Sequence, residues 1–460
     1  MQRKASLRGA LLVLLIIITI LSLGILVYGA PPHLPILLAA IVVTLYAASL
    51  KISYETLEKQ IVSSVSYGVI PILILLMIGI LIGLWLLGGT VQTITYYGLQ
   101  VLSPTYFLAT TVIITAVVAL MTGSSLSAIG TIGVSLMGVS IGMGADPAMT
   151  AGAIVSGAIF GDKLSPLSDT TNLAAATAKV DLFEHIRHML WTTIPALILT
   201  LVIFLFIGYG NQNGSNASLA DVQELILVLD QEFFIHILTV LSPLVIIVLA
   251  AMKVRPLPAL AAGMFVAVCT AFYTVPGLQV SALLDAMYGG YEANTGHAAI
   301  DELLSLGGLE DMLFGVSLII IALSFGGLIQ ATGITEALIR GIQSVLKSRG
   351  NTIASTLASC FGVNFVTGEQ YLSILLPGQM YEDAYKKHHL HPKNLSRTLE
   401  DGGTILHPLI PWGIIGAFVM TTLNVDFTYV FYTFLSIVTP FIALLYAYTG
   451  WTLTTRKVES

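Results

Sequence analysis

The sequence contains few charged residues. Asp, Glu, Lys and Arg make up 10% of its 460 residues, against about 25% in an ordinary soluble domain. Hydrophobic residues make up 56% of the chain, and no long stretch has the composition of a soluble domain. This composition excludes a soluble globular protein and predicts an all-α polytopic membrane protein.

Cysteine is equally scarce. The two cysteines, Cys269 and Cys360, fall in separate apolar segments. A disulfide framework needs several cysteines at regular spacing, and a zinc site needs cysteines or histidines in close pairs. We therefore expect neither a disulfide nor a bound metal cofactor.

The sequence also lacks the motifs of several other classes of protein. It has no HExxH zinc motif and no phosphate-binding P-loop. The Gly-X-Gly-Asp form of an intramembrane aspartyl protease is missing, because Phe160 stands two residues before Asp162. No basic run is interleaved with aromatic residues. We expect a protein that is not an enzyme, needs no cofactor and binds no nucleic acid.

Apolar runs are abundant. About fourteen are candidate membrane segments, and some are short enough to be half-length hairpins, so we expect about 11–14 segments in all. If the first run starts in the cytoplasm, every Lys and Arg except Lys163 falls on the cytoplasmic side or in a terminus. The positive-inside rule then places both the N-terminus and the C-terminus in the cytoplasm.

The two halves of the chain resemble each other weakly. Several short patterns recur at a nearly constant offset: Gly83 and Gly89 as Gly327 and Gly333, Thr122-Gly123 as Thr367-Gly368, and "LSPL" from Leu164 as "LHPL" from Leu406. We expect a first transmembrane repeat at 1–208, an external linker at 209–232 and a second repeat at 233–460, with an external polar insertion at 278–311. Inverted repeats with broken helices are typical of secondary transporters, which bind substrate where the breaks meet.

The stretch "GDKLSPLSDTTNLA", residues 161–174, lies between apolar runs and is unusually polar. Pro166 cannot donate a backbone hydrogen bond, so we expect the helix to unwind here. Freed carbonyls, hydroxyls and carboxylates are hard oxygen ligands, which suit a small alkali cation. The candidate ion-binding residues are Asp162, Lys163, Ser165, Ser168, Asp169, Thr171 and Asn172.

The second half offers a matching set. "LEDGGTILHPLIPWG" and "NFVTGEQY" are polar stretches between apolar runs. They contribute Glu369, Asp401 and Thr404 as further candidates. Other interpretations stay open, because Ser and Asp residues also cap helices and acids also lie at membrane edges.

"FGDKLSPLSDTTNLA", "TAGAIVSGAIFGDK", "LFEHIRHM" and "LEDGGTILHPLIPWG" closely resemble sequences of the NhaC-type sodium/proton antiporter family, within the ion transporter superfamily. The resemblance covers nearly the whole chain. It implies a bacterial inner-membrane antiporter that exchanges cytoplasmic sodium for external protons. It also implies that Asp162 and Asp169 are the transport residues and bind Na+.

The expected mechanism is competition. A carboxylate that binds either sodium or a proton gives exchange, and burial raises the pKa of a carboxyl group in general. Asp162→Asn and Asp169→Asn are each expected to abolish exchange. Lys163 is expected to neutralise one acid when the site is empty. The alternative is a sodium/proton-coupled organic-anion exchanger of the malate/lactate type. The sequence leaves the oligomeric state open, with a homodimer as one alternative.

Overall fold

The computed structural model describes residues 5–210, 219–295, 301, 304–343 and 346–455. Within these ranges the chain forms helices and loops, and the only β-pairing is an isolated bridge between Leu390 and Thr455. The expectation of an all-α fold is therefore confirmed. Both cysteines are free.

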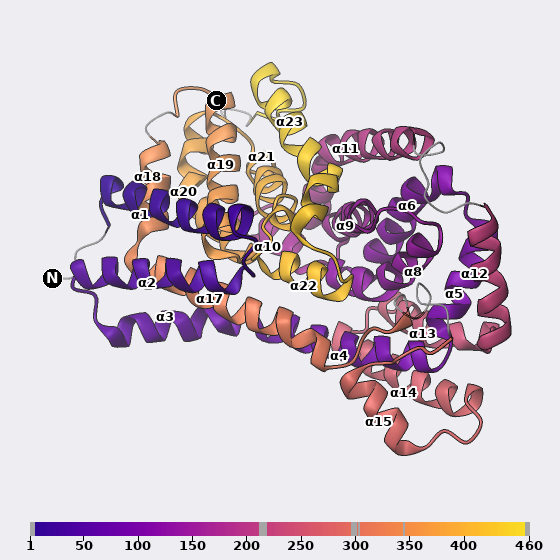
Figure 1. Cartoon of the computed structure of the whole chain (residues 1–460). Coiled ribbons are helices and arrows are strands. Elements are labelled where there is room, and N and C mark those ends of the chain that lie inside the picture. Colours follow the sequence, from indigo (N-terminus) through magenta and orange to yellow (C-terminus); the bar gives the residue numbers. More distant parts are fainter. Residues whose placement is uncertain (1–4, 211–218, 296–300, 302–303, 344–345, 456–460) are drawn as a thin grey trace.

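Helices follow one another with short connections in the first half (Figure 1). Ser6, Ser53, Ser124 and Asp146 accept hydrogen bonds from backbone N–H groups at the starts of their helices, as N-cap residues do. The elements are α1 (Leu7–Leu21), η1 (Ser22–Val27), α2 (His33–Ser49), α3 (Tyr54–Ser66), α4 (Val69–Leu87), α5 (Thr90–Val101), α6 (Pro104–Thr122), α7 (Ser125–Ala128), η2 (Ile129–Gly133), α8 (Val134–Gly142), α9 (Pro147–Leu164), α10 (Asp169–Ala178) and α11 (Leu182–Gly210).

The second half is also built of helices joined by loops. Its elements are α12 (Leu219–Glu232), η4 (Ile237–Val240), α13 (Leu241–Ala251), α14 (Pro256–Thr274), α15 (Val280–Gly289), η5 (Glu310–Met312), α17 (Leu313–Thr332), α18 (Ile334–Gln343), α19 (Arg349–Thr367), α20 (Gln370–Lys387), α21 (Pro392–Leu399), η6 (Glu400–Thr404), η7 (His407–Leu409), α22 (Ile414–Thr422), η8 (Phe427–Tyr432) and α23 (Phe434–Thr449).

The glycines that echo each other in sequence have matching backbone conformations. Gly89, after α4, and Gly333, after α17, have φ values of 80° and 71°. Gly123, after α6, and Gly368, after α19, have φ values of 66° and 64°. Residues other than glycine rarely adopt such left-handed conformations. The echoes therefore mark turns of similar backbone conformation, and the division into two repeats stays a prediction.

The two stretches expected to be external loops contain ordered structure. Residues 219–232 form α12, while 211–218 lie outside the described residues. Residues 280–289 of the polar insertion form α15, which packs along α4 (Figure 1). Farther along the insertion, the Gly308 N–H donates to the Gly79 carbonyl of α4 at 2.8 Å. The polar insertion therefore packs on α4 and is hydrogen-bonded to it.

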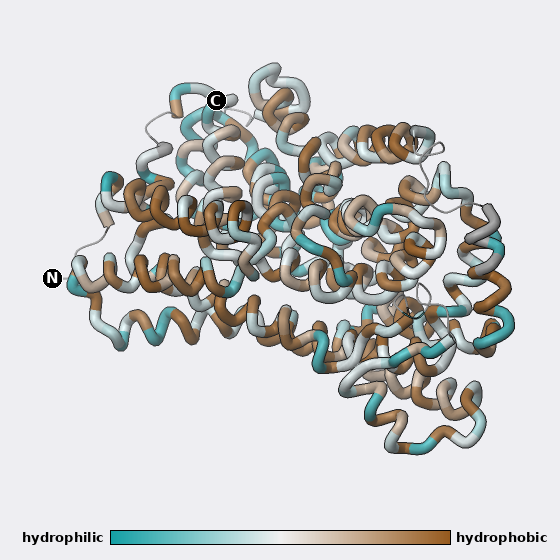
Figure 2. Tube along the Cα trace, viewed as in Figure 1, coloured by the Kyte–Doolittle hydropathy of each residue, from teal (hydrophilic) through white to brown (hydrophobic). Residues whose placement is uncertain are grey.

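Among the described residues, eight helices are long and apolar enough to cross a membrane. A ninth is formed if Leu225–Glu232 and Ile237–Ala251, which bend by 93°, are counted as one span. Two shorter apolar helices, His33–Ser49 and Phe434–Thr449, bring the number to the lower end of the expected range. Hydrophobic residues dominate the tube in Figure 2, especially along α1, α2 and α11. The chain is a multi-pass membrane protein.

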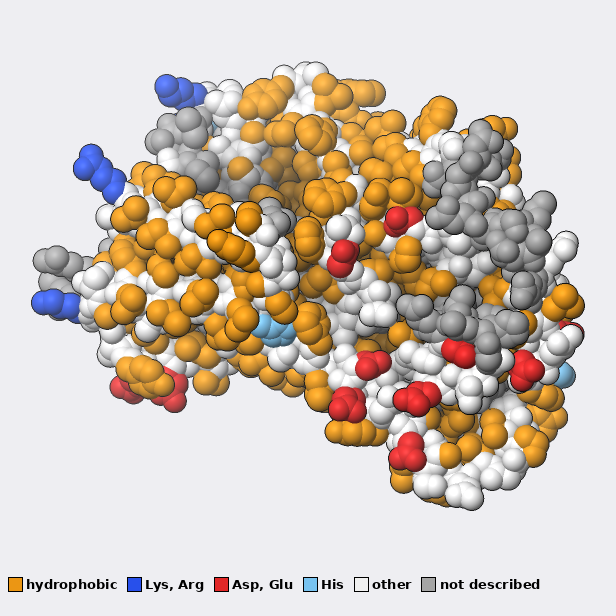
Figure 3. Space-filling model, in the orientation of Figure 1, with side chains coloured by type: hydrophobic (Ala, Val, Ile, Leu, Met, Phe, Trp, Pro, Cys, Tyr) orange, Lys and Arg blue, Asp and Glu red, His pale blue; other side chains and the backbone are white. Residues whose placement is uncertain are grey.

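Charged side chains of opposite sign lie at opposite ends of the visible face in Figure 3. Lys and Arg project at the end that carries the N-terminus, while most visible Asp and Glu lie at the other end. A broad belt of hydrophobic side chains separates them. This separation is the pattern expected when the membrane lies between a basic cytoplasmic surface and an external one.

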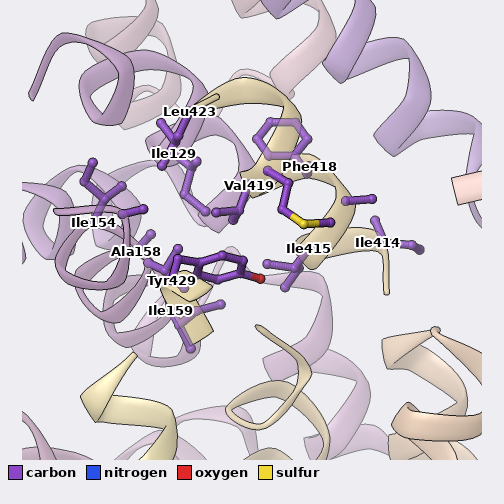
Figure 4. Close-up of a cluster of buried hydrophobic side chains, with 14 of the residues drawn as sticks. Ile129, Ile154, Ala158, Ile159, Ile414, Ile415, Phe418, Val419, Leu423 and Tyr429 are labelled. Atoms are coloured by element: carbon purple, nitrogen blue, oxygen red, sulfur yellow. The ribbon is translucent and has the colours of Figure 1, made fainter. Parts of the chain in front are cut away.

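The core joins the two halves of the chain. Figure 4 shows Ile154, Ala158 and Ile159 of α9 beside Phe418 of α22 and Tyr429 of η8. All five side chains are buried. The Tyr429 hydroxyl also donates to the carbonyl of Pro408, within η7, at 2.7 Å. Burial of this apolar surface holds the broken helix of the first half against that of the second.

Candidate functional site

The predicted break in the first half is confirmed. The α9 helix ends at Leu164 and α10 begins at Asp169. The Thr171 hydroxyl donates to the Lys163 carbonyl at 2.9 Å, and the Asn172 amide donates to the Pro166 and Ser168 carbonyls at 2.9 and 2.8 Å. These side chains replace backbone hydrogen bonds that the break removes. Thr171 and Asn172 therefore stabilise the break.

A reversal of the chain packs directly on this break. Helices α6 and α7 are joined by a tight turn at Gly123, and a Cβ placed on Gly123 would lie 2.5 Å from the Leu167 Cβ. From the same turn, the Ser125 N–H donates to Asp162 Oδ2 at 3.1 Å. The turn and the break together enclose the Asp162 carboxylate, which is 7% exposed.

Hydroxyl groups surround Asp162. The Ser125 and Ser168 side chains face its carboxylate. Ser168 and Thr170 share a hydrogen bond of 3.1 Å between their hydroxyls. Ser165 is fully buried, and its hydroxyl accepts from the Leu167 N–H at 3.3 Å. The structure therefore brings the Ser125 and Ser168 side chains to the Asp162 carboxylate, while the Ser165 hydroxyl bonds within its own turn. Ion binding by these residues stays a prediction.

Asp169 has a different setting. It begins α10 and is exposed, in contrast to Asp162. Asn172, Ala176 and Lys179 are also exposed and follow at helical spacing on the same face of α10. A carboxylate does not face lipid hydrocarbon without a large cost. These four residues form an exposed stripe on α10, which begins at the break and ends at Lys179.

The second half has an equivalent turn against an equivalent break. Helices α19 and α20 are joined at Gly368, whose carbonyl accepts from the Ile414 N–H of α22 at 3.2 Å. Glu369 is 1% exposed and accepts from the Tyr371 and Leu372 N–H groups at 2.9 and 2.7 Å. Ser124 caps α7 at the corresponding place in the first half. Glu369 is therefore a buried N-cap at the tip of the second hairpin.

An ion pair links the two broken helices. Lys163 Nζ, at the end of α9, donates to Asp401 Oδ1 in η6, and both side chains are fully buried. The Thr192 hydroxyl of α11 donates to the same oxygen at 3.0 Å. The acid paired with Lys163 belongs to the opposite half of the chain and is neither Asp162 nor Asp169. The role of Lys163 in an empty ion site stays a prediction. Thr404 is buried in the same turn as Asp401.

Sequence reasoning left three contributors out of the candidate set. Thr192 lies in an apolar span, where no local pattern marks it. Ser125 and Asn364 stand in recognisable polar turns but carry no charge. Thr192 bonds Asp401, Ser125 bonds Asp162, and Asn364 bonds the Gly403 carbonyl. Only the three-dimensional pairing of hairpin turns with broken helices identifies these roles. Within the described residues, no group of three His, Cys, Asp or Glu could hold a metal ion.

Comparison with known proteins agrees with this architecture. The model of the Na+/H+ antiporter family matches residues 6–171 and 157–451. The Na+/H+ antiporter NhaC of Alkalihalophilus pseudofirmus is 41% identical over 98% of this chain and 97% of its own length. NhaC of Bacillus subtilis is 40% identical over 90% of this chain and 91% of its own length. The malate-2H+/Na+-lactate antiporter of Bacillus subtilis is 36% identical over 91% of this chain and 90% of its own length. The chain belongs to the Na+/H+ antiporter family.

Proposed function

We propose that this chain is a secondary transporter that extrudes cytoplasmic sodium in exchange for protons. The observation that carries the proposal is the enclosed Asp162 carboxylate, which lies between a hairpin turn and a helix break with hydroxyl groups around it. Broken helices of this kind bind sodium through oxygen atoms in secondary transporters. The sequence similarity to two NhaC antiporters supports the same function.

Sodium and protons compete for the same oxygen atoms in this mechanism. Asp162 supplies the charge, while Ser125, Ser165 and Ser168 supply neutral oxygens within the same enclosure. Proton binding at the carboxylate cancels the charge that attracts sodium. Because only one of the two cations is held at a time, movement of the loaded site across the membrane gives exchange.

Asp169 receives sodium from the cytoplasm in this account. It stands where the exposed stripe of α10 meets the break, and the stripe ends at Lys179, which pairs with Glu382 of α20 at 3.0 Å. Tyr371 lies near Asp169 and Asp162, and its ring is 6.4 Å from that of Tyr67, a residue between α3 and α4. Sodium approaches along the exposed stripe of α10 and passes from Asp169 to Asp162.

The orientation follows from the charge distribution. With the basic end in the cytoplasm, both termini are cytoplasmic and the acidic loops are external. The membrane is the cytoplasmic membrane of a bacterial cell, which is the inner membrane where an outer one exists, because these two relatives are bacterial. The chain then removes sodium from the cytoplasm and uses external protons to do so.

An organic-anion exchanger is the second candidate, because one relative is a malate-2H+/Na+-lactate antiporter. Such a carrier needs a positive group to bind a carboxylate substrate. Lys163 is the obvious group, but it is fully buried and already paired with Asp401. The pairing favours the cation exchanger.

Purified protein in proteoliposomes that contain a pH-sensitive dye distinguishes the two candidates. External sodium chloride is expected to change the internal pH without any organic acid. A pH change that requires lactate or malate on the opposite side would instead establish the organic-anion exchanger.

A further inference from the structure

Several buried oxygen atoms around η6 have no hydrogen-bond partner among the described residues. All belong to side chains with no solvent exposure. The atoms are both carboxylate oxygens of Glu400, Oδ2 of Asp401, Oγ1 of Thr404 and Oδ1 of Asn364. Buried oxygens are normally satisfied by a donor or by a cation, so a group of them in one turn needs an explanation.

Glu400 is the clearest case among the buried acids. Asp162 accepts from the Ser125 N–H, and Glu369 accepts from two N–H groups at the start of α20. Asp401 is held by Lys163 and Thr192 through one oxygen. Glu400 has no such donor. A carboxyl group that lies in a protein interior without donors is neutralised either by a proton or by a cation beside it.

The bases near this cluster leave Glu400 without a direct partner. Lys163 bonds Asp401. The buried Arg397 also faces Asp401, but its guanidinium donates to the Thr452 hydroxyl. Asp162 and Cys360 are further titratable groups near the cluster, and neither adds a positive charge. A monovalent cation would supply the positive partner that the Glu400 oxygens lack.

These oxygens belong to the η6 turn and to the α19 residue that is bonded to it. Glu400 and Thr404 stand at the two ends of the wide η6 turn, and the Thr404 hydroxyl faces the Glu400 carboxylate without reaching normal hydrogen-bond geometry. Asn364 of α19 is anchored from the other side, because its amide N–H group donates to the Gly403 carbonyl at 2.7 Å.

The neighbouring helices close this turn. A Cβ on Gly402 would lie 2.8 Å from the Cys360 Cβ of α19. A Cβ on Gly403 would lie 2.9 Å from the Ser373 hydroxyl of α20. The oxygens therefore lie in an enclosed space rather than on a surface.

We propose that Glu400, Asp401, Thr404 and Asn364 form a second site for a monovalent cation, and that sodium occupies it during transport. The donors are all hard oxygen atoms, as for the first site, and no soft ligand is used. This inference rests on the proposed sodium exchange. It adds a cation that is held by the second half of the chain, in addition to the one at Asp162.

Sodium binding to the purified full-length chain tests the proposal. Equilibrium dialysis with radioactive sodium counts the ions bound by the wild type, Glu400→Gln and Asp162→Asn. Each variant is expected to bind one sodium ion fewer than the wild type. If Glu400→Gln binds as many ions as the wild type, the second site is overturned. If Asp162→Asn alone binds as many, the first site is wrong and the second stands.

Two further variants keep the test decisive. Glu382→Gln removes the same charge from a partly exposed side chain that pairs with Lys179, and it is expected to bind sodium like the wild type. If it also loses an ion, loss of any glutamate explains the result and the proposal fails. Should Glu400→Gln not fold, Thr404→Val removes only a hydroxyl ligand. It is expected to weaken one sodium site by about tenfold, and unchanged affinity would overturn the proposal.

Discussion

The two aspartates of the polar stretch have different environments, although the sequence suggests equal roles. Asp162 is enclosed by the α6–α7 turn, whereas Asp169 is exposed at the start of α10. An enclosed ligand determines whether the ion binds at all. An exposed acid mainly raises the local concentration of cations. The sequence leads us to expect that Asp162→Asn and Asp169→Asn each abolish exchange. From the structure we expect a larger loss of exchange for Asp162→Asn than for Asp169→Asn.

Asp169→Asn is expected to leave measurable exchange but to raise the sodium concentration that gives half-maximal rate by roughly tenfold. The reason is that a water-facing charge attracts the cation without completing its coordination. Sodium-dependent pH changes in proteoliposomes give this concentration directly. Complete loss of exchange in a folded Asp169→Asn protein would place Asp169 in the binding site itself.

The Lys163–Asp401 ion pair predicts strong coupling between the two halves. Lys163→Met leaves the buried Asp401 charge without its cation, and such a change typically costs about 3–5 kcal/mol. The thermal unfolding temperature of the detergent-solubilised protein is expected to fall markedly. Adding Asp401→Asn to Lys163→Met should restore most of the lost unfolding temperature, because neither buried charge then remains. If the double variant is no more stable than Lys163→Met, the two residues are not an ion pair.

At the scale of elements, the hairpin turns must fit against the breaks. Gly123→Ala is expected to abolish exchange, because the added Cβ would lie 2.5 Å from the Leu167 Cβ. Gly29→Ala is a matched control, since Gly29 has a similar φ of 61° and a Cβ there would meet nothing within 4 Å. Both changes share the backbone cost of roughly 1 kcal/mol. Transport assays on both variants separate the steric effect from that cost, and equal activities would contradict the proposed contact.

Much of this element-scale architecture can be predicted from the sequence. Pro166 with its polar neighbours indicates the first break, and the recurrent Gly123 and Gly368 indicate equivalent turns. The sequence does not reveal which turn packs on which break, or that Lys163 reaches Asp401. The Lys163–Asp401 contact joins residues 238 positions apart and the Ser125–Asp162 contact joins residues 37 positions apart, and no local pattern encodes them. The α12 helix was also missed, because its charged residues resemble those of a loop.

At the scale of the whole molecule, the charge distribution predicts the orientation in the membrane. Helix α14 provides a compact test, because Lys253 precedes it and Gln279 follows it, and both residues are exposed. Lys253→Cys and Gln279→Cys are made in a background with Cys269→Ser, which leaves the buried Cys360. A membrane-impermeant thiol reagent added to intact cells should label only Gln279→Cys. Labelling of only Lys253→Cys would reverse the orientation.

The most direct measurement of the central claim compares the wild type with Asp162→Asn in proteoliposomes. A pH gradient, acidic on the inside, is imposed, and the uptake of radioactive sodium is followed in the absence of organic acids. The account predicts sodium accumulation by the wild type and none by a folded Asp162→Asn protein, because the enclosed carboxylate is where sodium and protons compete. Equal uptake by the two proteins would contradict it.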